Sequence, residues 1–286
     1  MTERYISLAS GNASLSAILH TPTNTQPSQT GVLIIVGGPQ YRVGSHRQFV
    51  KLSRYLADNG IASMRLDTSG MGDSSGSKAA FYQQDNDLET AITAFMQHNP
   101  QLKNLVLWGL CDAASAILIK LNKPDPRIAG VVLLNPWVRQ QHSHAEVMLK
   151  HYYLKRLFSR QFWQKMFGGG VALRHSLKDI WQTLQQRKAK HSRTASTPEA
   201  NEQNYVQLML QGWQRYQGKT LLITSGNDLT AQEFLSLCQH DDSWRSLLSS
   251  AQHCHINDAN HTFSTLLWRQ QVEQLTFQFV QQLLSK

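Results

Sequence analysis

Residues 105–121 read LVLWGLCDAASAILIKL and change from a strand pattern to a helix pattern within a few positions. The unbroken apolar run from Leu105 to Trp108 is typical of a strand buried on both faces, as in a parallel sheet. Mostly small and aliphatic residues follow from Ala113 to Leu121 and favour a helix. The stretch therefore predicts a buried strand that turns sharply into a helix.

The same alternation of strand and helix recurs on both sides of this stretch. Further strands are expected at residues 32–36, 61–66, 131–134, 220–224 and 251–256, and helices at 48–58, 87–97 and 264–284. Repeated strand–helix units connect through right-handed crossovers, so the expected fold class is α/β, with a doubly wound, mostly parallel sheet. Two short runs, 5–8 and 15–20, predict an antiparallel hairpin at the start of the sheet.

The alternation stops after Pro136 and resumes at Thr220. About eighty residues are too many for a simple connection, so they predict an insertion. We expect a core domain at 1–136 and 217–286 and a helical cap insertion at 137–216, with helix at 146–167 and loop at 188–201.

The positive charge of the chain belongs mainly to this insertion. The formal net charge of the chain is +9, and twelve Lys and Arg residues but only two acids lie between Arg139 and Arg193. That segment alone therefore carries +10. A basic segment attracts anionic partners in general, although a charge run is often only a solvated face.

Composition excludes several protein classes. Hydrophobic residues make up 41% of the 286 residues, which indicates a globular chain. Residues 1–5 show no secretory signal, and the longest apolar runs fall far short of the roughly 20 residues of a membrane span. We expect a cytoplasmic protein, with peripheral binding at the inner membrane as an option. Three widely spaced cysteines favour neither a disulfide framework nor a zinc site, so we expect no metal and no organic cofactor.

Cys111 is the candidate nucleophile. The run Gly109-Leu110-Cys111-Asp112-Ala113 has the spacing of the nucleophile elbow G-x-S-x-G, with Cys in place of Ser and Ala113 in place of the second Gly. A thiolate is a strong nucleophile, and a nearby imidazole or a helix N-terminus lowers the pKa of a thiol. A buried structural cysteine is the alternative that the motif alone leaves open.

Two further residues fit the order nucleophile, acid, histidine that this elbow requires. Asp228 follows strand 220–224, and His261 lies between the last strand and the final helix. Asp228 could instead cap a helix, with Asp258 or Glu233 as the acid. We favour Asp228, because the acid belongs just beyond the carboxyl end of a strand.

The loop after strand 32–36 supplies the remaining candidates. The N–H groups of Gly38 and Asp112 are the candidate oxyanion-hole donors, although a glycine there could serve only a tight turn. Gln40, Arg42 and His46 are candidate substrate-binding residues. The Gly-rich segment 65–76 lacks the Lys-Ser/Thr pair of a P-loop, so nucleotide binding is not expected.

With these residues placed, the chain resembles the α/β-hydrolase superfamily along nearly its entire length. More narrowly, it resembles the exosortase A system-associated hydrolase 1 family. Five segments carry this narrower likeness: GGPQYR at 37–42, GSHRQF at 44–49, GLCD at 109–112, GNDLT at 226–230 and NHTFS at 260–264.

The resemblance implies a bacterial cytoplasmic hydrolase encoded among exopolysaccharide and protein-sorting genes. It assigns the nucleophile to Cys111, the acid to Asp228 and the base to His261. Cysteine variants of the fold, such as those that resemble dienelactone hydrolases, act on activated esters.

Two functions of different class follow. The first is hydrolysis of an ester or thioester, or acyl transfer, on a small-molecule acyl substrate through Cys111, His261 and Asp228. The alternative is a non-catalytic accessory protein whose basic cap docks on an anionic membrane surface or polysaccharide. Nucleic acid is not an expected partner, because no recognised binding motif accompanies the charge.

Overall fold

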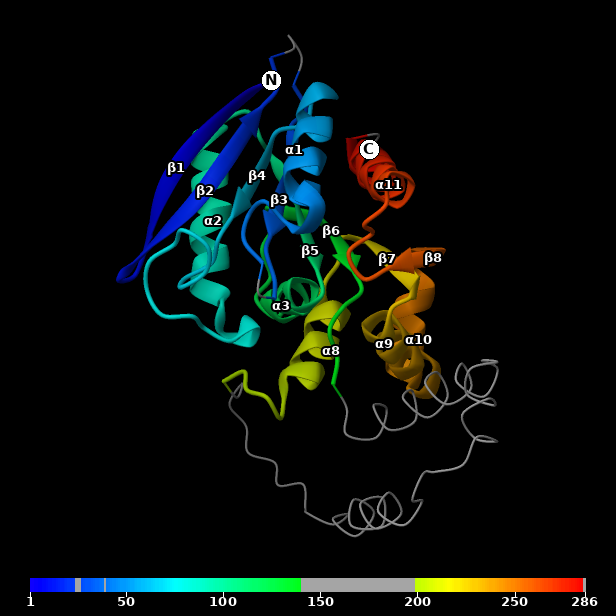
Figure 1. Cartoon of the computed structure of the whole chain (residues 1–286). Helices are drawn as coiled ribbons and strands as arrows, with labels where there is room; N and C mark the ends of the chain where they lie inside the picture. Colours follow the sequence, from blue (N-terminus) through cyan, green and yellow to red (C-terminus); the bar gives the residue numbers. More distant parts are fainter. Residues whose placement is uncertain (24–26, 39, 140–198, 285–286) are drawn as a thin grey trace, which may run out of the picture. The chain divides into compact units, whose positions relative to one another are not determined.

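A single twisted sheet organises the part of the chain that the structure describes. The computed structural model describes residues 1–23, 27–38, 40–139 and 199–284. Within them, eight strands pair in the order β1-β2-β4-β3-β5-β6-β7-β8 (Figure 1). Their bounds are β1 (Thr2–Ser10), β2 (Ala13–Thr21), β3 (Thr30–Ile35), β4 (Ser63–Leu66), β5 (Asn104–Leu110), β6 (Ile128–Leu134), β7 (Lys219–Asn227) and β8 (Gln252–Asn260).

The pairing directions confirm the predicted fold class. β1 with β2 and β2 with β4 are antiparallel, and all pairs from β4 to β8 are parallel. The hairpin expected at 5–8 and 15–20 is the β1–β2 pair, with both strands longer than predicted. Parallel strands place their carboxyl ends at one edge of the sheet, so the segments that follow β3, β5, β7 and β8 meet there.

Helices cover both faces of the sheet. The described α-helices are α1 (Gln48–Asp58), α2 (Asp85–His98), α3 (Asp112–Lys120), α8 (Tyr205–Arg215), α9 (Leu229–His240), α10 (Asp242–Ser250) and α11 (Leu266–Leu284). Apolar residues of α1 and α11 pack in one cluster with one face of the sheet. Those of α2, α3, α8, α9 and α10 pack in a second cluster with the other face. Figure 1 shows the two layers.

Strand β3 shows why the central strands are largely apolar. All six of its residues are buried. Val32 and Ile34 pack with the α1 and α11 side, whereas Leu33 and Ile35 pack with the α2 and α3 side. Alternate residues of a strand point to opposite faces, so a strand covered on both faces needs apolar residues throughout.

The end of the predicted cap belongs to the sheet unit. The described residues from 1 to 139 and from 200 to 284 form one compact unit. Helix α8 lies at the end of the segment 137–216, and it packs on α3 so closely that a methyl group on Gly212 would lie 1.9 Å from the carbonyl oxygen of Leu118. Residues 140–198, which hold the helix expected at 146–167 and most of the loop expected at 188–201, lie outside the described residues.

Helix α10 was not predicted from the sequence. Its sequence DSWRSLLSS has apolar residues only at Trp244, Leu247 and Leu248, a single i, i+3, i+4 set on a short helix, and of these only Trp244 is fully buried. The helix begins at a cap in which Oδ1 of Asp241 accepts from the N–H groups of Ser243 (2.9 Å) and Trp244 (3.1 Å). Trp244 packs against Trp213 and Phe234, which fixes α10 beside α8 and α9.

No helix among the described residues is long and apolar enough to span a membrane.

Candidate active site

Cys111 lies in a sharp turn between β5 and α3. Its backbone has φ 63° and ψ −125°, a conformation that is costly for a residue with a side chain and typical of functional turns. Its N–H donates to the carbonyl oxygen of Leu134 (2.8 Å), and its own carbonyl accepts from the N–H of Trp137 (3.2 Å). A methyl group on Gly109 would lie 2.8 Å from the backbone of Ala113 and Ala114, so glycine is required before the turn.

Asp228 and His261 are brought together at the same edge of the sheet. Nδ1 of His261 donates to Oδ2 of Asp228 over 2.8 Å, and the Asp228 side chain is 8% exposed. Asp228 also caps α9, because its two oxygens accept from the N–H groups of Thr230 and Ala231, each at 3.2 Å. The helix-cap and acid interpretations of Asp228 are thus compatible, since the cap holds the carboxylate toward the imidazole.

The electrostatics of His261 connect it to Cys111. Burial lowers the pKa of His261, but hydrogen bonds with Asp228 and Cys111 and the negative charges of both groups raise it to about 10. The imidazole therefore keeps its proton at neutral pH when the thiol is ionised. This arrangement allows an imidazolium–thiolate pair oriented by a carboxylate.

Asn135 is a site residue that the sequence reasoning missed. It follows β6 and is fully buried, with φ 43°. Its Oδ1 accepts from the N–H of Ser225 (2.9 Å), and its Nδ2 donates to Oγ of Ser225 (2.5 Å) and to the carbonyl oxygen of His261 (3.1 Å). Asn135 thus ties the end of β6 to β7 and to the histidine loop. A polar residue directly after a buried strand was the available signal.

The candidate oxyanion donors lie where the loop after β3 meets the start of α3. Gly38 has φ +64°, which favours glycine. A methyl group on Gly37 would lie 2.0 Å from Oδ1 of Asp112 and 2.6 Å from the backbone nitrogen of Ala113. The loop therefore touches the first turn of α3, immediately after Cys111. Pro39 lies outside the described residues.

The three candidate substrate-binding residues lie farther along the loop. Oε1 of Gln40 accepts from the N–H of Ser45 (3.1 Å), which closes the loop on itself. The Arg42 guanidinium forms ion pairs with Asp67 and Asp73, so its donors already have carboxylate partners. His46 is exposed and has φ 54°. Substrate binding by these residues remains a prediction, and for Arg42 it requires a competing anion.

The other two cysteines differ from Cys111 in their surroundings. Cys238 is 1% exposed, and burial raises the pKa of its thiol to about 12. Burial also raises the pKa of the Cys254 thiol. Both thiols are therefore held in the neutral, unreactive form at neutral pH.

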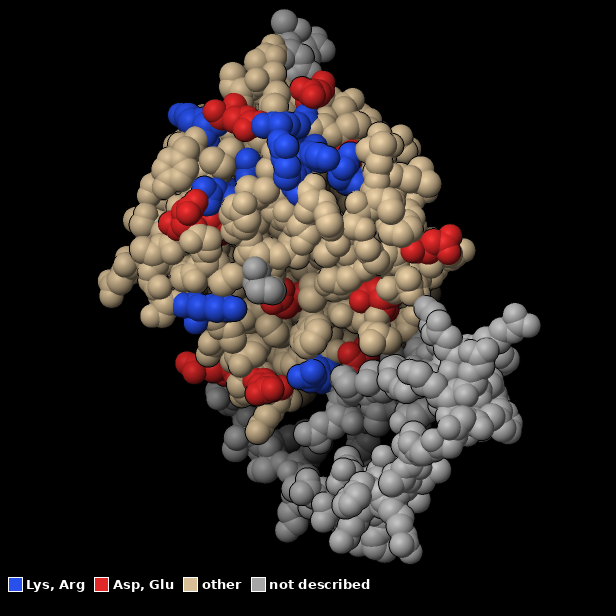
Figure 2. All heavy atoms as spheres, viewed as in Figure 1, with Lys and Arg blue, Asp and Glu red and all other residues tan. Residues whose placement is uncertain are grey.

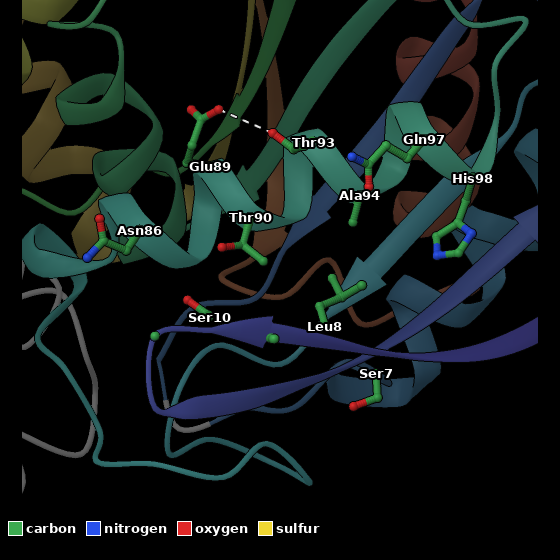
Figure 3. A pocket seen from close by; sticks show the side chains of 12 residues that line it. Ser7, Leu8, Ser10, Asn86, Glu89, Thr90, Thr93, Ala94, Gln97 and His98 are labelled. Atoms are coloured by element: carbon green, nitrogen blue, oxygen red, sulfur yellow. Dashed lines mark hydrogen bonds between the residues drawn. The ribbon is translucent and has the colours of Figure 1, made fainter.

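One hollow on the described surface lies away from these residues. It has a volume of about 630 Å³ and is lined by β1, the turn after it and α2 (Figure 3). Its lining is largely polar, with Ser7, Ser10, Asn86, Thr90, Thr93 and Gln97 among its side chains. None of the candidate catalytic residues lines this hollow. The candidate active site is therefore identified by the chemistry of its side chains and not by this hollow.

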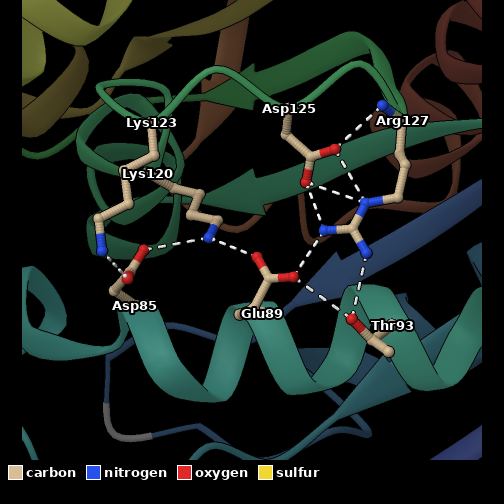
Figure 4. Close-up of polar contacts among 7 residues, drawn as sticks. All are labelled: Asp85, Glu89, Thr93, Lys120, Lys123, Asp125 and Arg127. Atoms are coloured by element: carbon tan, nitrogen blue, oxygen red, sulfur yellow. Dashed lines mark hydrogen bonds and ion pairs between the residues drawn. The ribbon is translucent and has the colours of Figure 1, made fainter.

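A second hollow contains a network of paired charges (Figure 4). Lys120 bridges Asp85 (3.1 Å) and Glu89 (2.8 Å), and Arg127 bridges Glu89 (2.6 Å) and Asp125 (2.7 Å). The Lys120 side chain is only 4% exposed. These ion pairs join α2 to α3 and to the segment before β6, which is a structural role.

The described surface carries charges of both signs. In Figure 2, Lys and Arg side chains gather mainly toward one end of the view, with acidic side chains beside them. All residues of the basic segment except Arg139 lie outside the described part of the chain. Across residues 1–23, 27–38, 40–139 and 199–284, no group of three His, Cys, Asp or Glu side chains is placed to hold a metal ion.

Solved structures with the same fold include several hydrolases. An esterase from Pyrococcus furiosus is 13% identical with a TM-score of 0.64, and the match covers 98% of this chain and 91% of that one. Est1E from Butyrivibrio proteoclasticus is 13% identical with a TM-score of 0.61, and the match covers 99% of each chain. The α/β-hydrolase GrgF from Penicillium sp. sh18 is 16% identical with a TM-score of 0.61 and full coverage of both chains. At such identities the likeness concerns the fold.

A family model gives the more specific result. No curated protein matches the chain. Residues 27–233, which are more than half of the chain, match the family described as "Serine aminopeptidase, S33". The description names a serine enzyme, whereas the elbow here carries Cys111. The expected α/β-hydrolase superfamily is confirmed, and the chain belongs to the S33 serine aminopeptidase family of α/β-hydrolases.

Proposed function

We propose that this α/β-hydrolase cleaves activated esters or thioesters of a small acyl substrate with Cys111 as the nucleophile. The observation that carries the proposal is the strained turn that presents Cys111 beside His261, whose Nδ1 is held by Asp228. A nucleophile, a base and an orienting acid are the three parts of a covalent acyl-transfer site.

The arrangement supports a two-step reaction. The Cys111 thiolate attacks the acyl carbonyl carbon, and the carbonyl electrons move to oxygen, where the N–H groups of Gly38 and Asp112 would stabilise the charge. The intermediate collapses to a Cys111 thioester, and the leaving group takes the proton from Nε2 of His261. A water molecule then loses a proton to Nε2 as it attacks the thioester, which releases the acid and restores Cys111.

The thiol nucleophile favours particular substrates. A thiolate is a better leaving group than an alkoxide, so the intermediate formed from a simple alkyl ester returns to reactants more often than it goes forward. An activated ester or a thioester has a leaving group that the tetrahedral intermediate expels as readily as the Cys111 thiolate, so the reaction goes forward. If an alcohol or amine replaces water in the second step, the same site performs acyl transfer.

The sequence resemblance supports a further proposal about the biological setting. The segments at 37–42, 44–49, 109–112, 226–230 and 260–264 resemble exosortase A system-associated hydrolases, so we place the acyl substrate in exopolysaccharide or exosortase systems of the bacterial cytoplasm. The +10 charge between Arg139 and Arg193 favours one second candidate, an accessory protein that binds an anionic membrane surface or polysaccharide without catalysis.

Steady-state hydrolysis tests the catalytic proposal. Wild type, Cys111→Ala and the matched control Cys238→Ala are assayed with p-nitrophenyl esters and acyl thioesters. We expect turnover by wild type and Cys238→Ala and loss of at least about a thousandfold in Cys111→Ala, as for other nucleophiles. Equal turnover by Cys111→Ala and wild type would exclude Cys111 as the nucleophile.

A further inference from the structure

The side chain of Asp112 has no role in the steps above, although it lies within the candidate oxyanion site. Asp112 follows Cys111 directly and is the first residue of α3. Its Oδ1 is buried and has no hydrogen-bond partner among the described residues. A buried carboxylate oxygen without a donor is unfavourable, because it has lost water and gained nothing in return.

The carboxyl group lies against the loop that carries the other oxyanion donor. Oδ1 occupies the space beside Gly37, where a methyl group would approach it to 2.0 Å. Burial raises the pKa of Asp112, and the N–H groups of Gly38, Ala113 and Asp112 and the charge of Lys78 only partly oppose that effect. The carboxyl group therefore lies close to both candidate oxyanion donors, the N–H of Gly38 and its own N–H.

This position has a consequence for catalysis. A negative carboxylate there would repel the negative oxygen of the tetrahedral intermediate and would compete for the same N–H groups. A neutral carboxyl group would do the opposite, because its O–H can donate to that oxygen. Burial in an apolar site can keep an aspartic acid neutral so that it serves as an oxyanion donor.

We propose that Asp112 acts as a neutral carboxylic acid whose O–H is a third donor to the oxyanion, beside the N–H groups of Gly38 and Asp112. The inference rests on the proposed acyl chemistry at Cys111. No bond to Asp112 forms or breaks; the acid keeps its proton and donates a hydrogen bond as negative charge develops on the substrate oxygen. Among the described residues, the charged side chain that acts on Asp112 is Lys78. Cys111 precedes Asp112 directly in the chain and interacts with His261, so a pH profile must also separate the titration of that pair from the titration of Asp112.

The test compares kcat/KM of wild type and Asp112→Asn with one activated ester from about pH 5 to about pH 9. Asparagine has nearly the shape of aspartic acid and offers a neutral N–H donor at every pH. Cys111 and His261 are present in both proteins, so their titrations affect both values of kcat/KM and cancel in the ratio. We expect the ratio of Asp112→Asn to wild type to rise with pH, by up to about tenfold per unit above the pKa of Asp112. We also expect Asp112→Ala, which has no donor, to be slower than Asp112→Asn at every pH.

Controls separate this role from a structural one. Asp242→Asn removes the equivalent acid from the first turn of α10, where the side chain is 94% exposed, and its ratio to wild type should stay constant with pH. Asp112→Ser supplies a second neutral donor if Asp112→Asn does not fold, and thermal unfolding checks each variant.

Two results would overturn the inference, and they differ in meaning. A constant ratio of Asp112→Asn to wild type, in an active wild type, would remove Asp112 from the oxyanion site and leave the acyl chemistry intact. Absence of any Cys111 acylation in wild type would refute the proposed function and the role of Asp112 together.

Discussion

Replacement of Asn135 by alanine should weaken both the fold and the site. The change removes three side-chain hydrogen bonds, two with Ser225 and one to the carbonyl oxygen of His261. At about 1 kcal/mol each, these amount to about 3 kcal/mol. Alanine at φ 43° adds about 1 kcal/mol, because this left-handed conformation is unfavourable for a residue with a Cβ. We expect the free energy of unfolding to fall by about 4 kcal/mol in total.

Activity should fall as well, because Asn135 holds the backbone of His261. A shift of about 1 Å in a catalytic group can cost about a hundredfold in rate, so kcat/KM of Asn135→Ala should drop by at least about that factor. Urea unfolding and ester hydrolysis measure the two effects. Asn135→Gly is the matched control, because glycine relieves the φ 43° conformation but lacks the amide, and it should recover only about 1 kcal/mol. Wild-type stability and activity in Asn135→Ala would refute the positioning role.

Three further predictions concern the thiols, the histidine and the basic segment. Limited alkylation with peptide mapping should label Cys111 first, because burial raises the pKa of the Cys238 and Cys254 thiols; labelling of Cys111 no faster than Cys238 would argue against a reactive thiolate. The pKa of His261 in the folded protein, about 10, lies above its ordinary 6.5, so its interactions stabilise the fold fully below about pH 6.5 and are lost as pH rises through about 10. The difference in unfolding free energy between wild type and His261→Ala should therefore shrink between about pH 7 and about pH 10, and a constant difference would contradict the charged pair. Charge reversal at Lys155 and Arg156 should abolish any salt-sensitive binding to anionic liposomes or acidic polysaccharide and leave hydrolysis of a small neutral ester unchanged; failure of wild type to bind either polyanion at low salt would exclude recruitment.

The sheet and the order of the candidate residues were predictable because each depends on local sequence. A buried parallel strand needs apolar residues on both faces, so β3, β5, β6 and β7 were recognisable from short runs. Cys111, Asp228 and His261 each follow a strand, and the carboxyl ends of parallel strands share one edge. Their relative position could therefore be inferred without coordinates.

The role of Asn135 could not be predicted in the same way, because its partners are distant in sequence. Ser225 and His261 lie 90 and 126 residues farther along the chain. The partners of Arg42 in the loop after β4 posed the same problem. Helix α10 was missed for a different reason, since its apolar face consists only of Trp244, Leu247 and Leu248, which cover about one turn, and the rest of its sequence is polar.

Direct detection of an acyl group on Cys111 tests the central claim most closely. Wild type is mixed briefly with an activated ester or acyl thioester, quenched in acid and digested, and each cysteine peptide is weighed by mass spectrometry. We predict one acyl group on the Cys111 peptide, none on the peptides of Cys238 and Cys254, and much slower loss of that group in His261→Ala, which lacks the base for water attack. Hydrolysis of the ester with no acyl group on Cys111 at any time, even in His261→Ala, would contradict the account.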